Sequence, residues 1–186
     1  IGEEGIVLLK NEDNALPLSQ DTKNVNVFGW AATQPYVGGT GSSASSAAPA
    51  VDILQSLTDA GYTYNQSLTD LYRDYAAERP AADMFGQNLT LPEPTIQSYT
   101  DEIMEEAKAF SDTAVVVIAR GGGENYDLPT DMKSVIDGTY NVSEKVSIAP
   151  ETYPYTKMTY TNNGDYDDFD AGESYLELSN TEEAML

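Results

Sequence analysis

The fold is decided by the run Thr113-Ala-Val-Val-Val-Ile-Ala119, which is the strongest strand signal in the chain. A continuous apolar run of this length predicts a strand covered on both faces, as a central strand of a parallel sheet is. Outward from it, Val25 to Gly29 predicts a second buried strand and Tyr62 to Tyr64 a short third one.

Helical patterns lie between these strands. Apolar spacing predicts helices between Pro49 and Gly61, over residues 66–78, and over residues 100–110 with Thr100 as N-cap. Ser179 and Glu182 form a capping-box pattern at the start of a last helix. Residues 2–9 suit a short helix or extended segment whose apolar side packs on something. The alternation predicts an α/β fold, with a largely parallel sheet flanked by helices.

The predicted sheet is incomplete. Only three strands are evident, residues 120–178 show no strong periodicity, and the chain lacks an initiator Met. A loop of this length far exceeds the usual ~4–6 residues, so it is either a functional covering or a segment without its packing partner. We therefore expect the chain to be a piece of a longer polypeptide.

Composition excludes several chemistries. The 186 residues include 31 acidic and 9 basic side chains, a net charge of −22, with no His and no Cys. A Ser-His-Asp triad, a Cys nucleophile and a disulfide framework are therefore excluded for this chain alone. So large a negative charge argues against nucleic-acid and membrane partners. The start of the chain has no signal-peptide pattern, which leaves the compartment unknown with a slight preference for the cytoplasm.

Two glycine-rich loops follow predicted strands. The Gly38–Ser42 loop lacks both the GxGxxG spacing and the Lys of a phosphate-binding loop, so it is either a flexible connector or a loop that offers backbone and hydroxyl groups to a ligand. The other loop, Arg120 to Asp127, exposes Glu124 after three glycines. Glu124 is a candidate proton donor, walled by Tyr126 and steadied by Arg120. The alternative is a solvated loop acid paired with Arg120.

Two other patterns lie in the long C-terminal segment. The acidic stretch from Asp165 to Glu173 fails the spacing of a calcium-binding EF-hand loop, so we expect a solvated acidic segment and no metal site. The Tyr-rich stretch from Tyr153 to Tyr166 has two open interpretations: stacking on sugar faces, or packing of the loop onto a core.

Five motifs follow one another along the chain: Glu4-Gly-Ile-Val-Leu-Leu-Lys-Asn-Glu12 with Leu16-Pro-Leu18, Val27-Phe-Gly29, Gly38-Gly-Thr-Gly-Ser42, Val115-Val-Val-Ile118 and Gly123-Glu-Asn-Tyr-Asp127. In this order they resemble the family-3 glycoside hydrolases, above all the β-glucosidases. The resemblance runs from about Gly2 to Pro129 and resumes from Leu176 to Leu186. Two departures are Asn125, where Gly is common, and residues 130–175, which have the look of an insertion without a counterpart.

The resemblance implies that residues 1–186 are part of the C-terminal α/β sandwich of such an enzyme, and that an N-terminal barrel with the Asp nucleophile lies upstream in the same polypeptide. It also implies retaining hydrolysis of a β-glucoside or oligosaccharide without metal or cofactor, with Glu124 as general acid/base. Ser42, Thr40 and Gly41 are then expected to bind the sugar, and Arg120, Tyr126 and Asp127 to support Glu124.

Two other functions remain open from the sequence. The chain is alternatively a non-catalytic carbohydrate-binding or interaction module, which the Tyr-rich, acidic segment favours. A nucleotide-binding α/β domain is a third hypothesis, already weakened by the missing Lys and Gly of the phosphate-binding motifs.

Overall fold

The computed structural model describes residues 2–36, 51–80, 88, 90–122, 128–140, 158–164 and 167–186. Its sheet has three parallel strands in the order β2-β1-β3: β1 (Asn24–Phe28), β2 (Thr63–Tyr64) and β3 (Ala114–Val116). The helices are α1 (Gly2–Gly5), α2 (Ile53–Asp59), α3 (Gln66–Ala77), α4 (Asp101–Phe110), α5 (Met132–Ile136) and α6 (Asn180–Met185), with 3-10 turns η1 (Trp30–Ala32) and η3 (Ile96–Ser98). The predicted parallel sheet flanked by helices is confirmed.

The order of the strands differs from the prediction. The strand in the middle is β1, whereas β3 pairs with β1 alone among the described residues. Val25 and Val27 of β1 are completely buried, but Val115 and Val116 are only half-buried. An apolar run shows that a strand is to be covered, but it does not show how many strands lie on either side of it.

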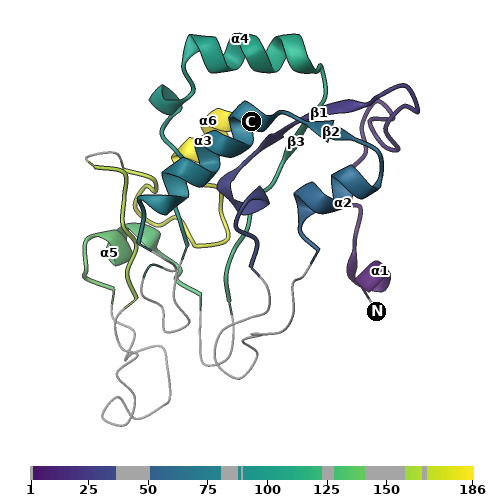
Figure 1. Ribbon diagram of the computed structural model, residues 1–186. Coiled ribbons are helices and arrows are strands. Elements are labelled where there is room, and N and C mark those ends of the chain that lie inside the picture. The colour runs from purple at the N-terminus through teal and green to yellow at the C-terminus, as the bar shows by residue number, and fades with distance from the viewer. Residues whose placement is uncertain are drawn as a thin grey trace.

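The two faces of β1 pack against different helices (Figure 1). Val25 and Val27 point to the face where Leu54 of α2 packs. Asn26 points to the opposite face, where its amide nitrogen donates to the carbonyl oxygen of Ala107 in α4 at 2.8 Å. Because side chains alternate along a strand, α2 covers one face while α3 and α4 cover the other.

Side-chain caps fix where the helices begin. The caps of α3, α4 and α6 are Asn65, Thr100 and Ser179, and Ser179 and Glu182 complete the predicted capping box. The predicted start near Pro49 lies outside the described residues, and α2 itself begins after its cap Asp52, whose carboxylate accepts from the Gln55 backbone N–H at 2.7 Å.

The long C-terminal segment has an apolar cluster of its own. The buried members of this cluster, called here the insertion cluster, are Met132, Val135, Met158, Tyr160, Phe169 and Tyr175. Tyr160 packs edge to face on Phe169, with ring centroids 5.7 Å apart. Of the two interpretations of the Tyr-rich stretch, packing onto a core therefore holds for Tyr160; Tyr153, Tyr155 and Tyr166 lie outside the described residues.

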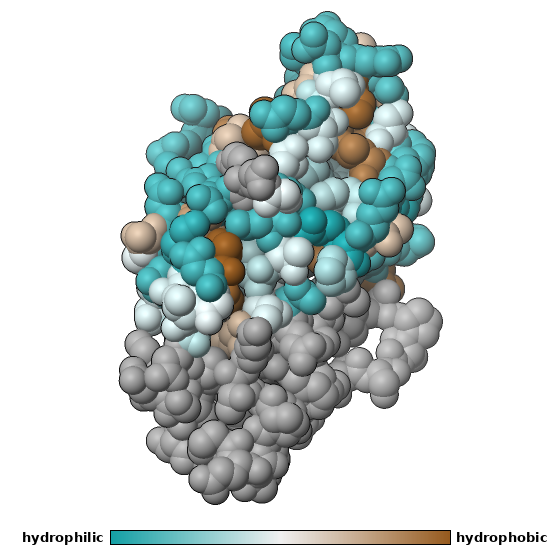
Figure 2. Space-filling view, turned by 90° about the vertical axis from the view of Figure 1, so that its left-hand side faces the viewer, coloured by the Kyte–Doolittle hydropathy of each residue, from teal (hydrophilic) through white to brown (hydrophobic). Residues whose placement is uncertain are grey.

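The surface reflects the large excess of acidic over basic side chains in the sequence. The face on the left of Figure 1 is mostly hydrophilic, with small separate apolar patches (Figure 2). Near the start of the chain, the side chains from Ile6 to Leu9 are 61–91% exposed, so none of the described residues supplies the surface on which they were expected to pack. Over the described ranges, no helix combines the length and apolar content that crossing a bilayer requires.

Candidate functional site

The carboxyl ends of β1 and β3 lie side by side. Phe28 is in register with Val116, and the Val117 backbone N–H donates to the Phe28 carbonyl oxygen at 2.9 Å. Gly29 follows β1 with φ +97°, and a Cβ there would overlap the carbonyl oxygen of Val117. Glycine is thus required for this close approach. The connections after both strands, residues 29–36 and 117–122, therefore leave the same edge of the sheet, where open α/β sheets bind ligands.

The residues predicted to bind the sugar and to carry the acid/base chemistry stand just past these connections. Outside the described residues are Thr40, Gly41, Ser42, Glu124, Tyr126 and Asp127. Arg120 is described, as are the segments that lead into both loops. What the structure supplies is the geometry of the sheet edge from which the two loops depart.

Arg120 is paired with Glu182 of α6. The two nitrogens Nη1 and Nη2 donate to the Glu182 carboxylate at 2.7 and 2.5 Å, and Nε donates to the Tyr175 carbonyl oxygen at 2.7 Å. The other two donors are used on the carbonyl oxygens of Ala119 and Glu177. The five N–H donors of the guanidinium all have partners among the described residues. The expected support of Glu124 by Arg120 stays a prediction, because Glu124 lies outside the described residues; the acidic partner of Arg120 among them is 62 residues away in the sequence.

Tyr175 is the second residue at this edge. It is completely buried, and its hydroxyl accepts from the Gly121 backbone N–H at 2.8 Å. Its own backbone N–H donates to the Pro129 carbonyl oxygen at 2.9 Å. Tyr175 thus contacts the chain on both sides of residues 123–127. The sequence analysis missed it, because Tyr175 stands 54 residues from Gly121 in a segment without periodicity.

Glu93 lies beneath the same edge and was also missed. Its side chain is 1% exposed, and one carboxyl oxygen accepts from the Trp30 backbone N–H at 3.2 Å. The other, Oε1, is buried without a hydrogen-bond partner among the described residues. Burial raises the pKa of Glu93 to about 8, so at neutral pH the group is mostly the uncharged acid. The only sequence signal is its place between Pro92 and Pro94, which is typical of a surface loop.

Asp168 contradicts the expected solvated acidic segment. It is completely buried, and its carboxylate accepts from the Tyr160 hydroxyl at 3.1 Å and from the Thr181 hydroxyl at 3.0 Å. Burial raises the pKa of Asp168 to about 6. The contacts join the insertion cluster to α6. In the part of the chain that the structure describes, no group of three acidic side chains is placed to hold a metal ion.

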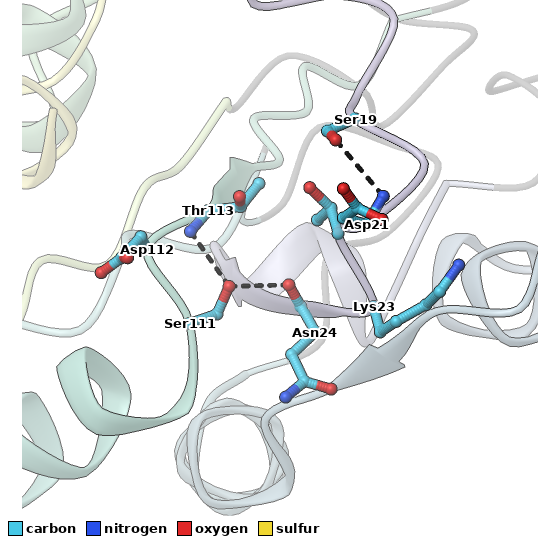
Figure 3. Close-up of a pocket in the computed structure, with 8 residues that line it drawn as sticks. Ser19, Asp21, Lys23, Asn24, Ser111, Asp112 and Thr113 are labelled. Carbon is cyan, nitrogen blue, oxygen red and sulfur yellow. Dashed lines mark hydrogen bonds between the residues drawn. The ribbon is translucent and has the colours of Figure 1, made fainter.

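A polar hollow lies at the opposite, amino-terminal end of β1 and β3 (Figure 3). Its polar groups are used locally: the Ser111 hydroxyl donates to the Asn24 carbonyl oxygen at 2.6 Å and accepts from the Thr113 N–H at 3.0 Å. Ligands of open α/β sheets bind at the carboxyl ends of strands, so this hollow is not the candidate site.

Comparisons with known proteins agree with this architecture. The model of the glycosyl hydrolase family 3 C-terminal domain matches residues 6–162. β-Glucosidase A from Butyrivibrio fibrisolvens is 32% identical over 129 residues, 67% of this chain and 14% of that protein. A β-glucosidase from Ruminococcus albus is 34% identical over 131 residues, 68% of this chain and 13% of its own length.

Solved structures give the same result. β-Glucosidase 3B from Thermotoga neapolitana, in complex with α-D-glucose, superposes with a TM-score of 0.53 at 30% identity, over 69% of this chain and 18% of that one. A β-glucosidase from Paenibacillus barengoltzii gives 0.55 at 34% identity, over 66% of this chain and 13% of that one. The chain spans about one seventh of the length of the curated relatives it matches. With the match to residues 6–162 and these relatives together, the chain belongs to the glycosyl hydrolase family 3 C-terminal domain family.

Proposed function

We propose that this chain is the part of a retaining β-glucosidase that supplies the general acid/base, with Glu124 in that role. The observation that carries the proposal is the family match over residues 6–162, which includes both glycine-rich loops. The adjacent carboxyl ends of β1 and β3 support it, because they direct both loops to one edge of the sheet.

In this proposal the reaction uses two carboxylates about 5–5.5 Å apart. An Asp of the barrel attacks the anomeric carbon while Glu124 protonates the departing glycosidic oxygen. Glu124 then removes a proton from the water that opens the glycosyl-enzyme. Ser42, Thr40 and Gly41 bind the sugar from the other loop. Arg120 takes part indirectly, by fixing the segment that precedes Glu124 to Tyr175 and Glu182.

The proposed partner is the barrel domain in the same polypeptide. Ile6, Val7, Leu8 and Leu9 are exposed, and a contiguous exposed apolar segment is typical of a surface that packs on another part of a protein. The substrate is a β-glucoside or an oligosaccharide that ends in one. The related proteins are named β-glucosidases, which supports this substrate class.

The test is Glu124→Ala in the complete enzyme, assayed with cellobiose and with dinitrophenyl β-glucoside. Without its acid, the enzyme should lose about 10²- to 10⁴-fold in kcat/KM on cellobiose, and much less on the activated aryl glucoside, whose leaving group needs no proton. Azide should restore turnover of the aryl glucoside, since an anionic nucleophile needs no general base. Unchanged activity on cellobiose would eliminate Glu124 as the acid/base.

The non-catalytic alternative predicts a different result. As a carbohydrate-binding module, the chain by itself should bind glucose or cellobiose with a millimolar or lower Kd in calorimetry. Among the described residues, Tyr160 is buried in the insertion cluster, so its ring is not available to a sugar. The proposed enzyme predicts no heat of binding from the chain without the barrel, because most contacts to the sugar then come from the barrel.

A further inference from the structure

The chain on both sides of the Glu124 loop is bonded to one buried tyrosine, Tyr175. The hydroxyl of Tyr175 accepts from the Gly121 N–H at 2.8 Å, two residues before the segment 123–127, and the Tyr175 N–H donates to the Pro129 carbonyl oxygen at 2.9 Å, two residues after it. The Tyr175 carbonyl oxygen accepts from Nε of Arg120 at 2.7 Å. One residue therefore holds the two ends of the Glu124 loop at a fixed separation.

The chemistry of the loop explains why such a contact matters. Arg120 is followed by three glycines, which lack a Cβ and therefore restrict the backbone least of all residues. The Tyr175 ring, in contrast, is fixed among the apolar side chains of the insertion cluster and beneath the Arg120 guanidinium, 5.7 Å from the ring centroid. A rigid hydroxyl bonded to a glycine N–H supplies the restriction that the sequence of the loop does not.

We propose that Tyr175 is a positioning residue for the acid/base step, which acts by holding the two ends of the Glu124 loop. The proposal rests on the proposed function of Glu124. It gives the insertion a task at the active site, because Tyr175 and its supporting cluster come from that segment.

The experiment measures kcat/KM of Tyr175→Phe in the complete enzyme, with cellobiose and with dinitrophenyl β-glucoside. For a retaining enzyme kcat/KM reports the steps through glycosylation, and only cellobiose needs proton donation there. A misplaced acid should lower kcat/KM on cellobiose about threefold to tenfold, as expected for one lost hydrogen bond, and leave the aryl glucoside nearly unchanged. The ratio of kcat/KM on the aryl glucoside to kcat/KM on cellobiose should therefore rise about threefold to tenfold.

The matched control is Tyr160→Phe. Tyr160 is buried in the same insertion cluster as Tyr175, but its hydroxyl donates to Asp168 at 3.1 Å and not to a residue that borders the Glu124 loop. It should change both substrates equally. Arg120→Lys gives a second reading, since it removes the Nε donor to the Tyr175 carbonyl oxygen and keeps the positive charge, and it should raise the ratio as well.

The outcomes separate the two proposals. A raised ratio in Tyr175→Phe and Arg120→Lys, with none in Tyr160→Phe, supports the positioning role. A wild-type ratio in Tyr175→Phe overturns it, as does an equal loss on both substrates. If Tyr175→Phe does not fold, the ratio in Arg120→Lys decides in the same way. If Glu124→Ala raises the ratio and the Tyr175 and Arg120 variants do not, only the positioning role fails; if Glu124→Ala does not raise it, the acid/base assignment fails.

Discussion

Arg120 and Glu182 form a bidentate ion pair between the segment after β3 and α6, with N–O distances of 2.7 and 2.5 Å. Their side chains are 15% and 5% exposed, so the pair is largely shielded from water. One Glu182 oxygen also accepts from the Ser179 N–H at 2.8 Å, which makes the same carboxylate half of the α6 capping box. A single side chain therefore closes the helix start and neutralises the cation at the sheet edge.

Glu182→Ala should destabilise the fold by about 3–5 kcal/mol, because it leaves the Arg120 charge buried without its partner. Loss of the capping box adds to the cost. The free energy of unfolding is measured by urea denaturation. Glu183→Ala is the control, since Glu183 is exposed one residue further along α6, and it should change the stability by less than about 0.5 kcal/mol. Equal effects of both substitutions would refute the role of the pair.

Local signals in the sequence predicted the elements well, and contacts between distant segments account for what was missed. The caps Thr100 and Ser179 act within three residues of themselves, so pattern alone located the starts of α4 and α6. Which strand is central depends on neighbours across the sheet, and among the described strands β1, not the apolar run at Val115, lies in the middle.

The candidate site divides in the same way. The motifs that predicted its loops are contiguous, whereas the side chains that organise the sheet edge are paired over 54 to 63 residues: Tyr175 with Gly121, Arg120 with Glu182, and Glu93 with Trp30. Nothing in the residues next to Glu93 distinguishes a buried carboxyl from a surface acid. Its environment is created only when η1 packs against the segment that carries it.

Glu93 should make the protein less stable as the pH rises. Its pKa is about 8 in the folded chain against an ordinary value of 4.5, so between these values the folded state binds more protons than the unfolded state. The free energy of unfolding therefore decreases with rising pH across this window. Asp168, with a pKa of about 6 against 3.8, acts in the same direction at lower pH.

Glu93→Gln should flatten this decrease between pH 6 and pH 8, because the amide keeps the shape of the protonated acid and has no proton to lose. Urea unfolding at the two pH values measures the difference. Glu78→Gln, an exposed change at the end of α3, should leave the dependence as it is in the unaltered protein. A variant at Glu93 with the original pH dependence would show that another group is responsible.

Gly29 and Gly61 make a matched pair for the close approach of β1 and β3. Both have positive φ, +97° and +88°, but a Cβ at Gly29 meets the Val117 carbonyl oxygen while one at Gly61 meets nothing within 4 Å. Gly61→Ala should cost only the conformational strain, about 1–2 kcal/mol. Gly29→Ala adds a clash with backbone, and we expect a loss of more than about 3 kcal/mol in urea unfolding. Similar losses at both positions would mean that the strands can separate without penalty.

Asn26 holds β1 to the helices on one face through its side-chain amide. The nitrogen donates to the carbonyl oxygens of Ala107 and Ser111 at 2.8 and 2.9 Å, and the oxygen accepts from the Asn65 amide at 3.1 Å. Asn26 is only 4% exposed, so if its amide were removed, its hydrogen-bond partners could not bond to water instead. At a strand position of this kind an apolar residue is the usual occupant, and hydrophobicity alone predicts that Asn26→Leu stabilises the protein.

The hydrogen bonds predict the opposite. Asn26→Leu should destabilise the fold by about 3 kcal/mol, since it removes two buried hydrogen bonds and one partly buried one and leaves the Asn65 amide and the Ser111 carbonyl without this partner. Asn24→Ala is the control: Asn24 is exposed and makes one side-chain bond, of 3.3 Å, to the Phe110 carbonyl oxygen, so its loss should cost under about 1 kcal/mol.

A double-mutant cycle of Asn26→Leu with Asn65→Ala isolates the contact between the two side chains. The combined loss of stability should be smaller than the sum of the two single losses, because Asn65→Ala removes the amide that Asn26→Leu leaves unpaired. Strict additivity would place the cost of Asn26→Leu in the packing of Leu and not in the unpaired amide.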